Sequence, residues 1–242
     1  VALGINRDST EFAAGRGELE SRGSVLSAYA SVWLPKDAYL DANLSYGRNR
    51  FDLSRRLRFN LGSVSVDQRA EADTDATLLG GSLALGRDWQ LRSWSLGAYL
   101  RGQFSRVEYD AFEERMIGGR AGEGLGLRVE SPRWNSLEGV LGGRASRAYS
   151  FDWGVLLPNL MFEYSREFRD DPSRLDASFL ADPTGGVFSQ SGAPIDQSHV
   201  NLGLGMSAVF PGGRSGFLQY ERRLQDDRIS HWLLSIGGRW EF

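Results

Sequence analysis

The sequence contains no cysteine, which excludes a disulfide framework and a metal site built from thiolates. It also has no apolar run close in length to the about 20 residues that a membrane-spanning helix needs. The longest runs, such as 154–157 and 232–234, are short. Proline is scarce, with 7 residues, and there are only 2 histidines. The net charge of −3 provides no general attraction for nucleic acid, so a nucleic-acid partner is not expected.

The sequence is instead rich in segments that alternate between apolar and polar residues. In 40–47 the even positions are apolar and the odd ones are small or polar, and 200–208 repeats this pattern. Alternate side chains of a strand point to opposite faces, so each segment has one apolar face and one small or polar face. About 9–11 such residues cross a bilayer as a strand, so ordinary overall hydropathy is compatible with a membrane barrel.

The alternating segments predict ten strands and no helices. Their expected spans are 1–11, 24–34, 38–52, 74–86, 92–110, 134–149, 153–168, 198–210, 215–224 and 230–242. A serial run of strands without sustained helical periodicity indicates either a sandwich or a barrel.

The connections between these strands favour the barrel. Short turns are expected at 35–37, 87–91, 150–152 and 211–214, and they alternate with longer polar connections at 12–23, 53–73, 111–133 and 169–197 and a short one at 225–228. Short turns on one rim and long loops on the other are typical of outer-membrane barrels. We therefore expect an all-β fold, a transmembrane antiparallel up-and-down β-barrel in the outer membrane of a Gram-negative bacterium, with a periplasmic C-terminus.

Aromatic residues cluster at every predicted short turn, where an interfacial girdle is expected, because tyrosine and tryptophan favour the membrane–water boundary. The predicted girdle consists of Trp33, Tyr39, Trp89, Trp94, Phe151, Trp153, Phe210 and Phe242.

The polar face of the strands carries charges of both signs, which would be costly against hydrocarbon and are therefore expected to line the barrel interior. By alternation, this predicted pore-lining set is Arg101, Gln103, Glu138, Arg144, Asn159, Glu163, Gln219, Glu221, Arg239 and Glu241. Two interpretations remain open. The charges form a hydrophilic pore that carries or holds a polypeptide, or they only pair with one another and brace the wall.

The C-terminal strand resembles the β-signal that the outer-membrane assembly machinery recognises. Its polar residue, glycine and two final aromatics are Ser235, Gly237, Trp240 and Phe242. An exposed strand edge can be captured by β-augmentation, and Gly237 would permit a close approach of backbone. We expect this motif to act as the assembly signal.

Several stretches together resemble the translocator β-barrel domain of autotransporters (type V secretion). They are 44–49, 141–145, 179–185, 200–205 and 237–242. The resemblance implies a twelve-stranded barrel, of which ten strands are visible here, with a helix threading the pore and an N-terminal passenger. Residues 1–242 are then one translocator domain, expected to lack the first two strands and the pore helix of the family. The implied partners are outer-membrane lipid and lipopolysaccharide, the β-barrel assembly machinery and the protein's own passenger, and the domain is expected to be a monomer.

Three other functions fit parts of the pattern. A passive porin or small-solute channel would share the polar interior, an outer-membrane enzyme barrel would use a histidine such as His199 or His231, and a soluble β-sandwich would share the alternation. The sequence has no metal-ligand spacing, phosphate-binding loop or nucleophile elbow. We therefore expect no enzyme activity in this chain and no cofactor or metal.

Overall fold

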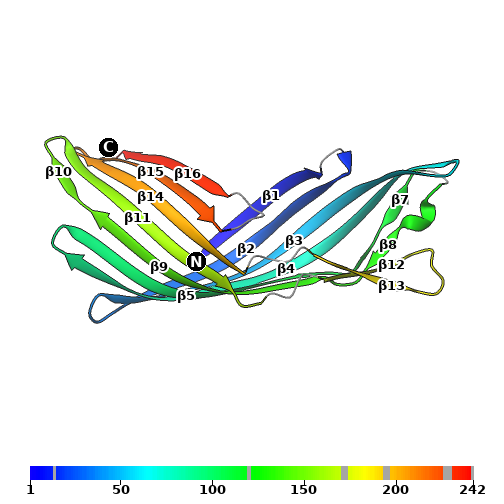
Figure 1. The fold of residues 1–242 in the computed structure, drawn as a ribbon, viewed down its shortest axis with the longest axis horizontal. Coiled ribbons are helices and arrows are strands. Elements are labelled where there is room, and N and C mark those ends of the chain that lie inside the picture. The colour runs from blue at the N-terminus through cyan, green and yellow to red at the C-terminus, as the bar shows by residue number, and fades with distance from the viewer. Residues whose placement is uncertain (13–14, 119–120, 170–173, 193–196, 226–230, 241–242) are drawn as a thin grey trace.

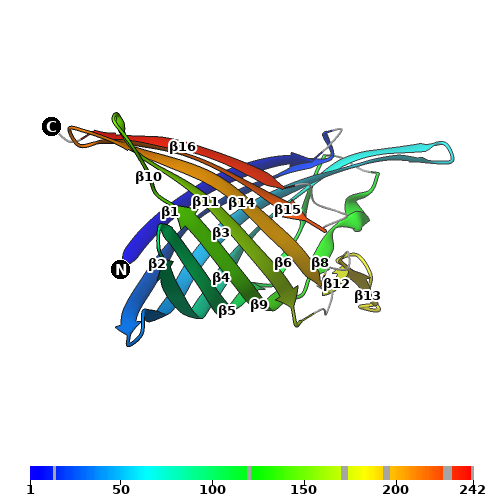
Figure 2. The same ribbon diagram turned by 60° about the vertical axis from the view of Figure 1, so that its left-hand side comes forward.

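One long antiparallel sheet dominates the computed structural model, which describes residues 1–12, 15–118, 121–169, 174–192, 197–225 and 231–240. Ten strands follow one another in the order β1-β2-β3-β4-β5-β9-β11-β14-β15-β16. The sheet curves into a trough whose two long edges are β1 and β16 (Figures 1 and 2). The predicted all-β, antiparallel, up-and-down fold is confirmed, and the strands form an open half-barrel.

The strands of the main sheet differ greatly in length. They are β1 (Ala2–Phe12), β2 (Gly17–Leu34), β3 (Ala38–Leu61), β4 (Val64–Leu91), β5 (Trp94–Tyr109), β9 (Arg133–Arg147), β11 (Gly154–Glu167), β14 (Ser198–Phe210), β15 (Arg214–Leu224) and β16 (Trp232–Trp240). Two short strands extend this sheet, with β7 (Arg115–Ile117) pairing with β4 and β10 (Tyr149–Phe151) pairing with β11.

A second, smaller sheet forms within two of the long connections. Its order is β13 (Val187–Ser191), β12 (Arg174–Phe179), β8 (Leu127–Val129) and β6 (Phe112–Glu113). A 3-10 turn, η2 (Glu123–Leu125), lies beside it. Within the described ranges, the helices include none that is long and apolar enough to cross a membrane.

Several predicted boundaries are wrong. The predicted connection 53–73 is strand except for a tight turn, since β3 and β4 meet at Gly62, whose φ of 59° is left-handed, and Ser63. The predicted connection 12–23 likewise holds the start of β2, and the predicted turn 87–91 is strand, with Arg92 (φ 55°) in the actual turn. The predicted connections 111–133 and 169–197 contain the second sheet.

In the strand segments that the sequence did not predict, the apolar side chains point inward and the charged ones outward, the reverse of the expected pattern. In 66–76 of β4 the side chains that point into the trough are mostly buried, among them Val66, Gln68 and Ala70, and in β3 the inward Phe51, Leu53 and Leu57 are half-buried, whereas the outward neighbours on both strands are mostly charged. A sheet in water buries its apolar face against another layer. Alternation read as an apolar outer face therefore could not detect these segments.

A partly buried ion pair joins the second layer to the tall hairpin of β3 and β4. Arg55 donates from Nε and Nη2 to the two oxygens of Glu114, at 2.5 and 2.6 Å, and also to the carbonyl oxygen of Leu125 at 3.1 Å. Glu114 additionally accepts the amide of Leu127 at 2.9 Å. These bonds hold the segment between β6 and β8 against the inner face of the hairpin.

Candidate functional site

The inner, concave face of the main sheet carries a cluster of polar groups that reach across the trough. The Tyr99 hydroxyl on β5 donates to Glu163 on β11, and Arg101 Nη2 lies 3.2 Å from the same carboxylate oxygen. Strand β9 separates β5 from β11, and its Gly142 lies directly beneath the Tyr99 ring, where a Cβ would be 2.1 Å from Tyr99 Cζ. Glycine at 142 therefore makes room for this cross-strand contact.

A second inner cluster lies next to the first. Gln103 on β5 donates its amide to Glu138 on β9, and His199 Nε2 on β14 lies 3.8 Å from the other oxygen of that carboxylate. His199 thus contacts a carboxylate–amide cluster on the inner face.

A third cluster lies toward the short-turn end of the sheet. Arg144 on β9 donates to both oxygens of Asp88 on β4, at 2.8 and 2.7 Å, and its guanidinium carbon lies 5.5 Å from the centre of the Tyr39 ring. Tyr39 is only 8% exposed, so its predicted place in the girdle is wrong. Trp33 packs edge-on against Tyr39 on the same face, with ring centroids 5.9 Å apart.

The predicted interior residues all share the inner face by strand register where the structure describes them. Asn159 and Gln219 lie on either side of Gly205, where a Cβ would come within 2.6 Å of Asn159 Oδ1 and 1.9 Å of Gln219 Oε1. Glu221 and Arg239 continue this face on β15 and β16. Glu241 lies outside the described residues.

The C-terminal motif occupies the edge strand β16. Ser235 and Gly237 lie on the inner face, whereas Trp240 lies on the outer face and is 68% exposed. Within the domain, the atoms nearest to Gly237 belong to the Phe217 ring, 2.3 Å from a built Cβ. Phe242 lies outside the described residues.

Outward aromatic residues do gather at the short-turn end. Phe151 stacks on Trp153 with centroids 5.2 Å apart, and Trp153 packs against Phe210 at 5.5 Å. Trp94 lies on the outer face beneath Arg147, whose guanidinium carbon is 5.5 Å from the ring centre. This end therefore has the aromatic character of a membrane interface.

Above this aromatic rim, the outer face of the sheet is an uncharged band. Beyond the outward Arg87, Arg147 and Arg214 of the rim itself, the outward positions of the strands are uncharged across the band over the described residues, as in the even positions 96–104 of β5 and 156–164 of β11. Large apolar side chains of this band are exposed, with exposed fractions of 62% for Leu100, 60% for Leu204 and 74% for Ile236. An outer face of this kind suits hydrocarbon and not water.

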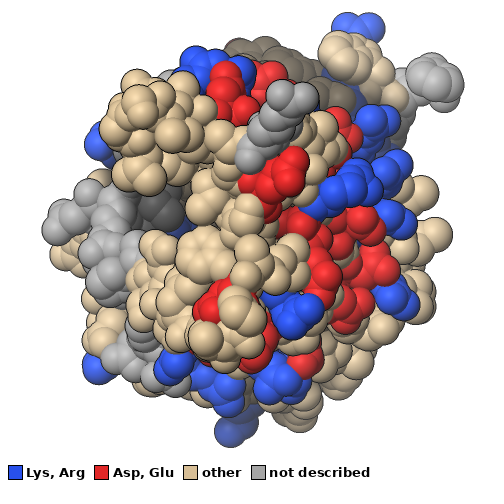
Figure 3. All heavy atoms as spheres, turned by 90° about the vertical axis from the view of Figure 1, so that its right-hand side faces the viewer, with Lys and Arg blue, Asp and Glu red and all other residues tan. Residues whose placement is uncertain are grey.

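The opposite end of the sheet has mixed charge. Figure 3 views this end and shows Lys and Arg crowded beside Asp and Glu. Below the second sheet lies an apolar cavity of about 660 Å³, lined by inward residues of β2 and β3 that include Leu19, Phe51 and Leu53, and by Trp134. A polar cavity of about 600 Å³ lies deeper in the trough, beside Tyr99 and Arg144.

Sequence reasoning missed the partners that complete these clusters. Tyr99, Asp88 and Tyr39 contact Glu163 and Arg144 over intervening strands. Alternation places a residue on a face, but it does not show which distant strands the curvature brings within reach. The glycine opposite Tyr99 was the available signal, because an aromatic beside a glycine in register indicates a ring lying over the neighbouring strand.

An uncharged outer face, an aromatic rim and a polar inner wall define a membrane β-barrel protein. A family model for the autotransporter beta-domain matches residues 1–221, and the chain therefore belongs to the autotransporter β-domain family. Membership places it among outer-membrane barrels of Gram-negative bacteria, as a translocator domain with a linked passenger.

Solved structures agree with this assignment. The translocator domain of autotransporter NalP from Neisseria meningitidis superposes with a TM-score of 0.66 at 20% identity, over 99% of this chain and 73% of that chain. The beta domain of the Bordetella autotransporter BrkA gives 0.60 at 21% identity, over 99% and 81%. At these identities the likeness shows the fold alone. No curated protein matched the chain.

Proposed function

We propose that this domain inserts into the outer membrane and mediates export of an N-terminal passenger to the cell surface. The observation that carries the proposal is the combination of an uncharged outer face with a continuous polar inner wall on the same strands. A polypeptide that crosses the barrel needs a hydrated surface that offers hydrogen-bond donors and acceptors without a strong net charge. The paired groups Arg101–Glu163 and Arg144–Asp88 provide such a surface.

The inner wall would line the path of the passenger. The proposed lining residues are Arg101, Gln103, Glu138, Arg144, Glu163, Gln219, Glu221 and Arg239, with Glu241 as a further member. Most of these side chains are tied to a partner across the wall, so they would present a smooth polar surface and not single charges that trap a peptide.

Assembly would begin at the C-terminal strand. β16 pairs only with β15 among the described residues, so its other edge can pair with a strand of the assembly machinery. Ser235, Gly237, Trp240 and Phe242 would be the recognised residues, with Trp240 exposed at the aromatic rim. In this proposal, the short-turn end and the C-terminus lie in the periplasm and the tall hairpin lies outside the cell.

The test uses the full-length protein with its passenger in intact Gram-negative cells. Added protease should remove the passenger while the barrel remains folded, as judged by its shift in mobility on heating. The variant Trp240→Ser/Phe242→Ser should lose most of the folded barrel and with it the surface passenger. Trp33→Ser, an exposed aromatic of the same rim on the inner face, should not.

Each outcome bears on a separate part of the proposal. A passenger that stays protected from protease while the barrel is folded would show that export is wrongly assigned. Normal levels of folded barrel in the Trp240→Ser/Phe242→Ser variant would show that the assembly signal is wrongly assigned.

A further inference from the structure

Where the uncharged band of the outer face ends, on the side away from the short turns, the first charged outward residue of most strands is an arginine. These arginines, here called the arginine belt, are Arg7, Arg22, Arg48, Arg106, Arg133, Arg166 and Arg222. Their side chains are on the convex surface, directly beyond the last apolar outward residues of the same strands.

The belt follows strand geometry and not a sequence repeat. Arg106 comes as far after the start of β5 at Trp94 as Arg166 comes after the start of β11 at Gly154. Strand β4 is the exception, because its first outward charge is Asp75, which pairs with Arg48 of the neighbouring strand at 3.3 Å. The positive charge thus recurs at one level around much of the sheet.

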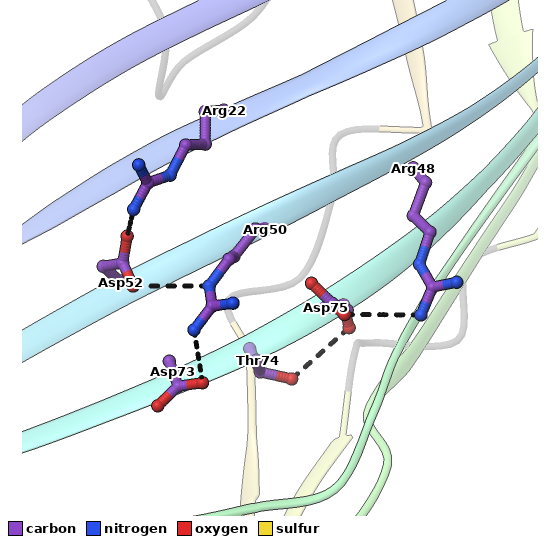
Figure 4. A network of polar contacts seen from close by, with 7 residues as sticks. All are labelled: Arg22, Arg48, Arg50, Asp52, Asp73, Thr74 and Asp75. Carbon is purple, nitrogen blue, oxygen red and sulfur yellow. Dashed lines mark hydrogen bonds and ion pairs between the residues drawn. The ribbon is translucent and has the colours of Figure 1, made fainter.

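The carboxylates that pair with Arg22, Arg48 and Arg106 lie farther from the uncharged band, whereas Arg133 pairs with Glu108 directly opposite it in the strand register. Arg22 pairs with Asp52 at 2.7 Å, and Arg106 pairs with Glu108 at 2.8 Å (Figure 4 shows the first pair). Each of these pairs uses only the Nη2 nitrogen of the arginine. The guanidinium therefore keeps further N–H donors, and the order of charges puts the cation next to the apolar band and the anion beyond it.

We propose that the arginine belt binds the phosphate groups of the phosphorylated glycolipid of the outer leaflet, the lipid A part of lipopolysaccharide. A ligand that meets an apolar surface and an arginine side by side must carry acyl chains and an anionic group at their junction. Arginine recognises phosphate through several N–H donors at once. The inference rests on the orientation given in the proposed function, in which the tall hairpin faces outward.

Two arginines on the opposite rim, Arg147 and Arg87, are held differently. The Arg147 guanidinium carbon lies 4.8 Å from the centre of the Tyr149 ring and also over Trp94, and that of Arg87 lies 5.6 Å from the centre of the Trp89 ring. A guanidinium stacked on an aromatic ring has one face covered. The two rims therefore differ in the anion contacts that they can offer.

The experiment measures lipid A binding to the purified, folded full-length protein in detergent, with diphosphorylated lipid A and lipid A without phosphates as the two probes. The belt variant is Arg22→Gln/Arg48→Gln/Arg106→Gln. The matched control is Arg56→Gln/Arg58→Gln/Arg69→Gln, which removes three outward arginines farther from the band, with 48%, 66% and 54% of their side chains exposed. Heat-dependent mobility checks that every variant is folded, and the corresponding triple lysine variant keeps the charge should the glutamine variant fail to fold.

The belt variant should bind diphosphorylated lipid A about tenfold or more weakly, the control should bind like the wild type, and the lysine variant should lie between them. Removal of the phosphates should bring the wild type to the level of the belt variant. Equal binding of both probes by the wild type, or an equal loss in the control, would overturn the proposal. Because lipid A binding is measured without export, a negative binding result would not contradict the proposed export function. A negative export result would likewise not contradict lipid A binding by the arginine belt.

Discussion

The two ends of the long strands differ in which face carries the apolar side chains, although they belong to the same sheet. Toward the short turns, the outer face is uncharged and the inner face is polar, as Leu83 and Arg101 illustrate. Beyond the arginine belt, the outer face is mostly charged and the inner face carries many apolar side chains, some of them buried, as at Val66. The switch occurs without a break in hydrogen bonding between β3 and β4. The medium around each half, and not strand propensity, therefore decides which face is apolar.

The halves also differ in what covers the inner face. In the membrane half, inner side chains meet only one another across the trough, as Tyr99 and Glu163 do. In the outer half, the second sheet and the segment before it lie over the hairpin, so Ala70 and Ala76 are each 1% exposed. The outer half thus has a covering layer over its inner face, whereas the buried side chains of the membrane half, such as Val140, lie beneath their neighbours on the same sheet.

The largest expected effect comes from placing a charge on the outer face of the membrane half. Leu83→Lys puts an ammonium near the middle of the uncharged band on β4 and should lower the free energy of unfolding by about 2–4 kcal/mol. Ser65→Lys, on the same face of the same strand beyond the belt, should change it by less than about 0.5 kcal/mol. Equilibrium unfolding in urea in the presence of lipid measures both, and equal effects would refute the division into two halves.

A smaller and local loss of stability is expected when the ion pair between the two layers of the outer half is removed. Glu114, whose side chain is 9% exposed, holds Arg55 and the amide of Leu127. Glu114→Ala should destabilise the segment from β6 to β8 by about 2 kcal/mol. That corresponds to roughly thirtyfold more frequent opening, measured as faster trypsin cleavage after Arg115 and Arg128.

Glu163→Ala is the matched control in the membrane half. Its carboxylate is 10% exposed and also has two side-chain partners, but it lies far from the trypsin sites. Cleavage in this variant should keep the wild-type rate. A rise equal to that of Glu114→Ala would mean that the two layers are not held by a local contact.

The membrane half was predictable from the sequence because its pattern has a single cause. Lipid on one side and a polar interior on the other impose alternation, so the ten strands, their order and the faces of Arg101 and Leu204 followed from periodicity. The outer half was not predictable in the same way, because there Leu53 and Phe51 point inward between polar and charged neighbours, and the segment resembles a polar loop.

The second sheet and the clusters depend on tertiary contacts that leave little local trace. Strand β6 has 2 residues and β8 has 3, too few to show a period. Tyr39 looked like an interfacial aromatic because it follows a short turn, yet curvature brings it beneath Arg144 from three strands away. Contact between distant strands requires the shape of the sheet, which alternation does not contain.

The smallest effect is expected at the surface of the outer half, in the turn between β12 and β13. Asp182 accepts bonds from the Thr184 hydroxyl at 2.7 Å, the Thr184 amide at 2.9 Å and the Gly186 amide at 3.1 Å, which lower the pKa of Asp182 below its ordinary value. A depressed carboxyl pKa stabilises the folded turn at any pH above the unfolded value of about 3.9. That contribution is lost as the pH falls below this value and through the folded pKa.

A carboxyl-carbon NMR titration of the folded protein, assigned with Asp182→Asn, should therefore give a midpoint below about 3.9 for Asp182. Thr184→Val removes the hydroxyl donor, the largest cause, while keeping the two amides, so its midpoint should rise toward that value without reaching it. A wild-type midpoint at or above the ordinary value would show that these bonds do not favour the charged form.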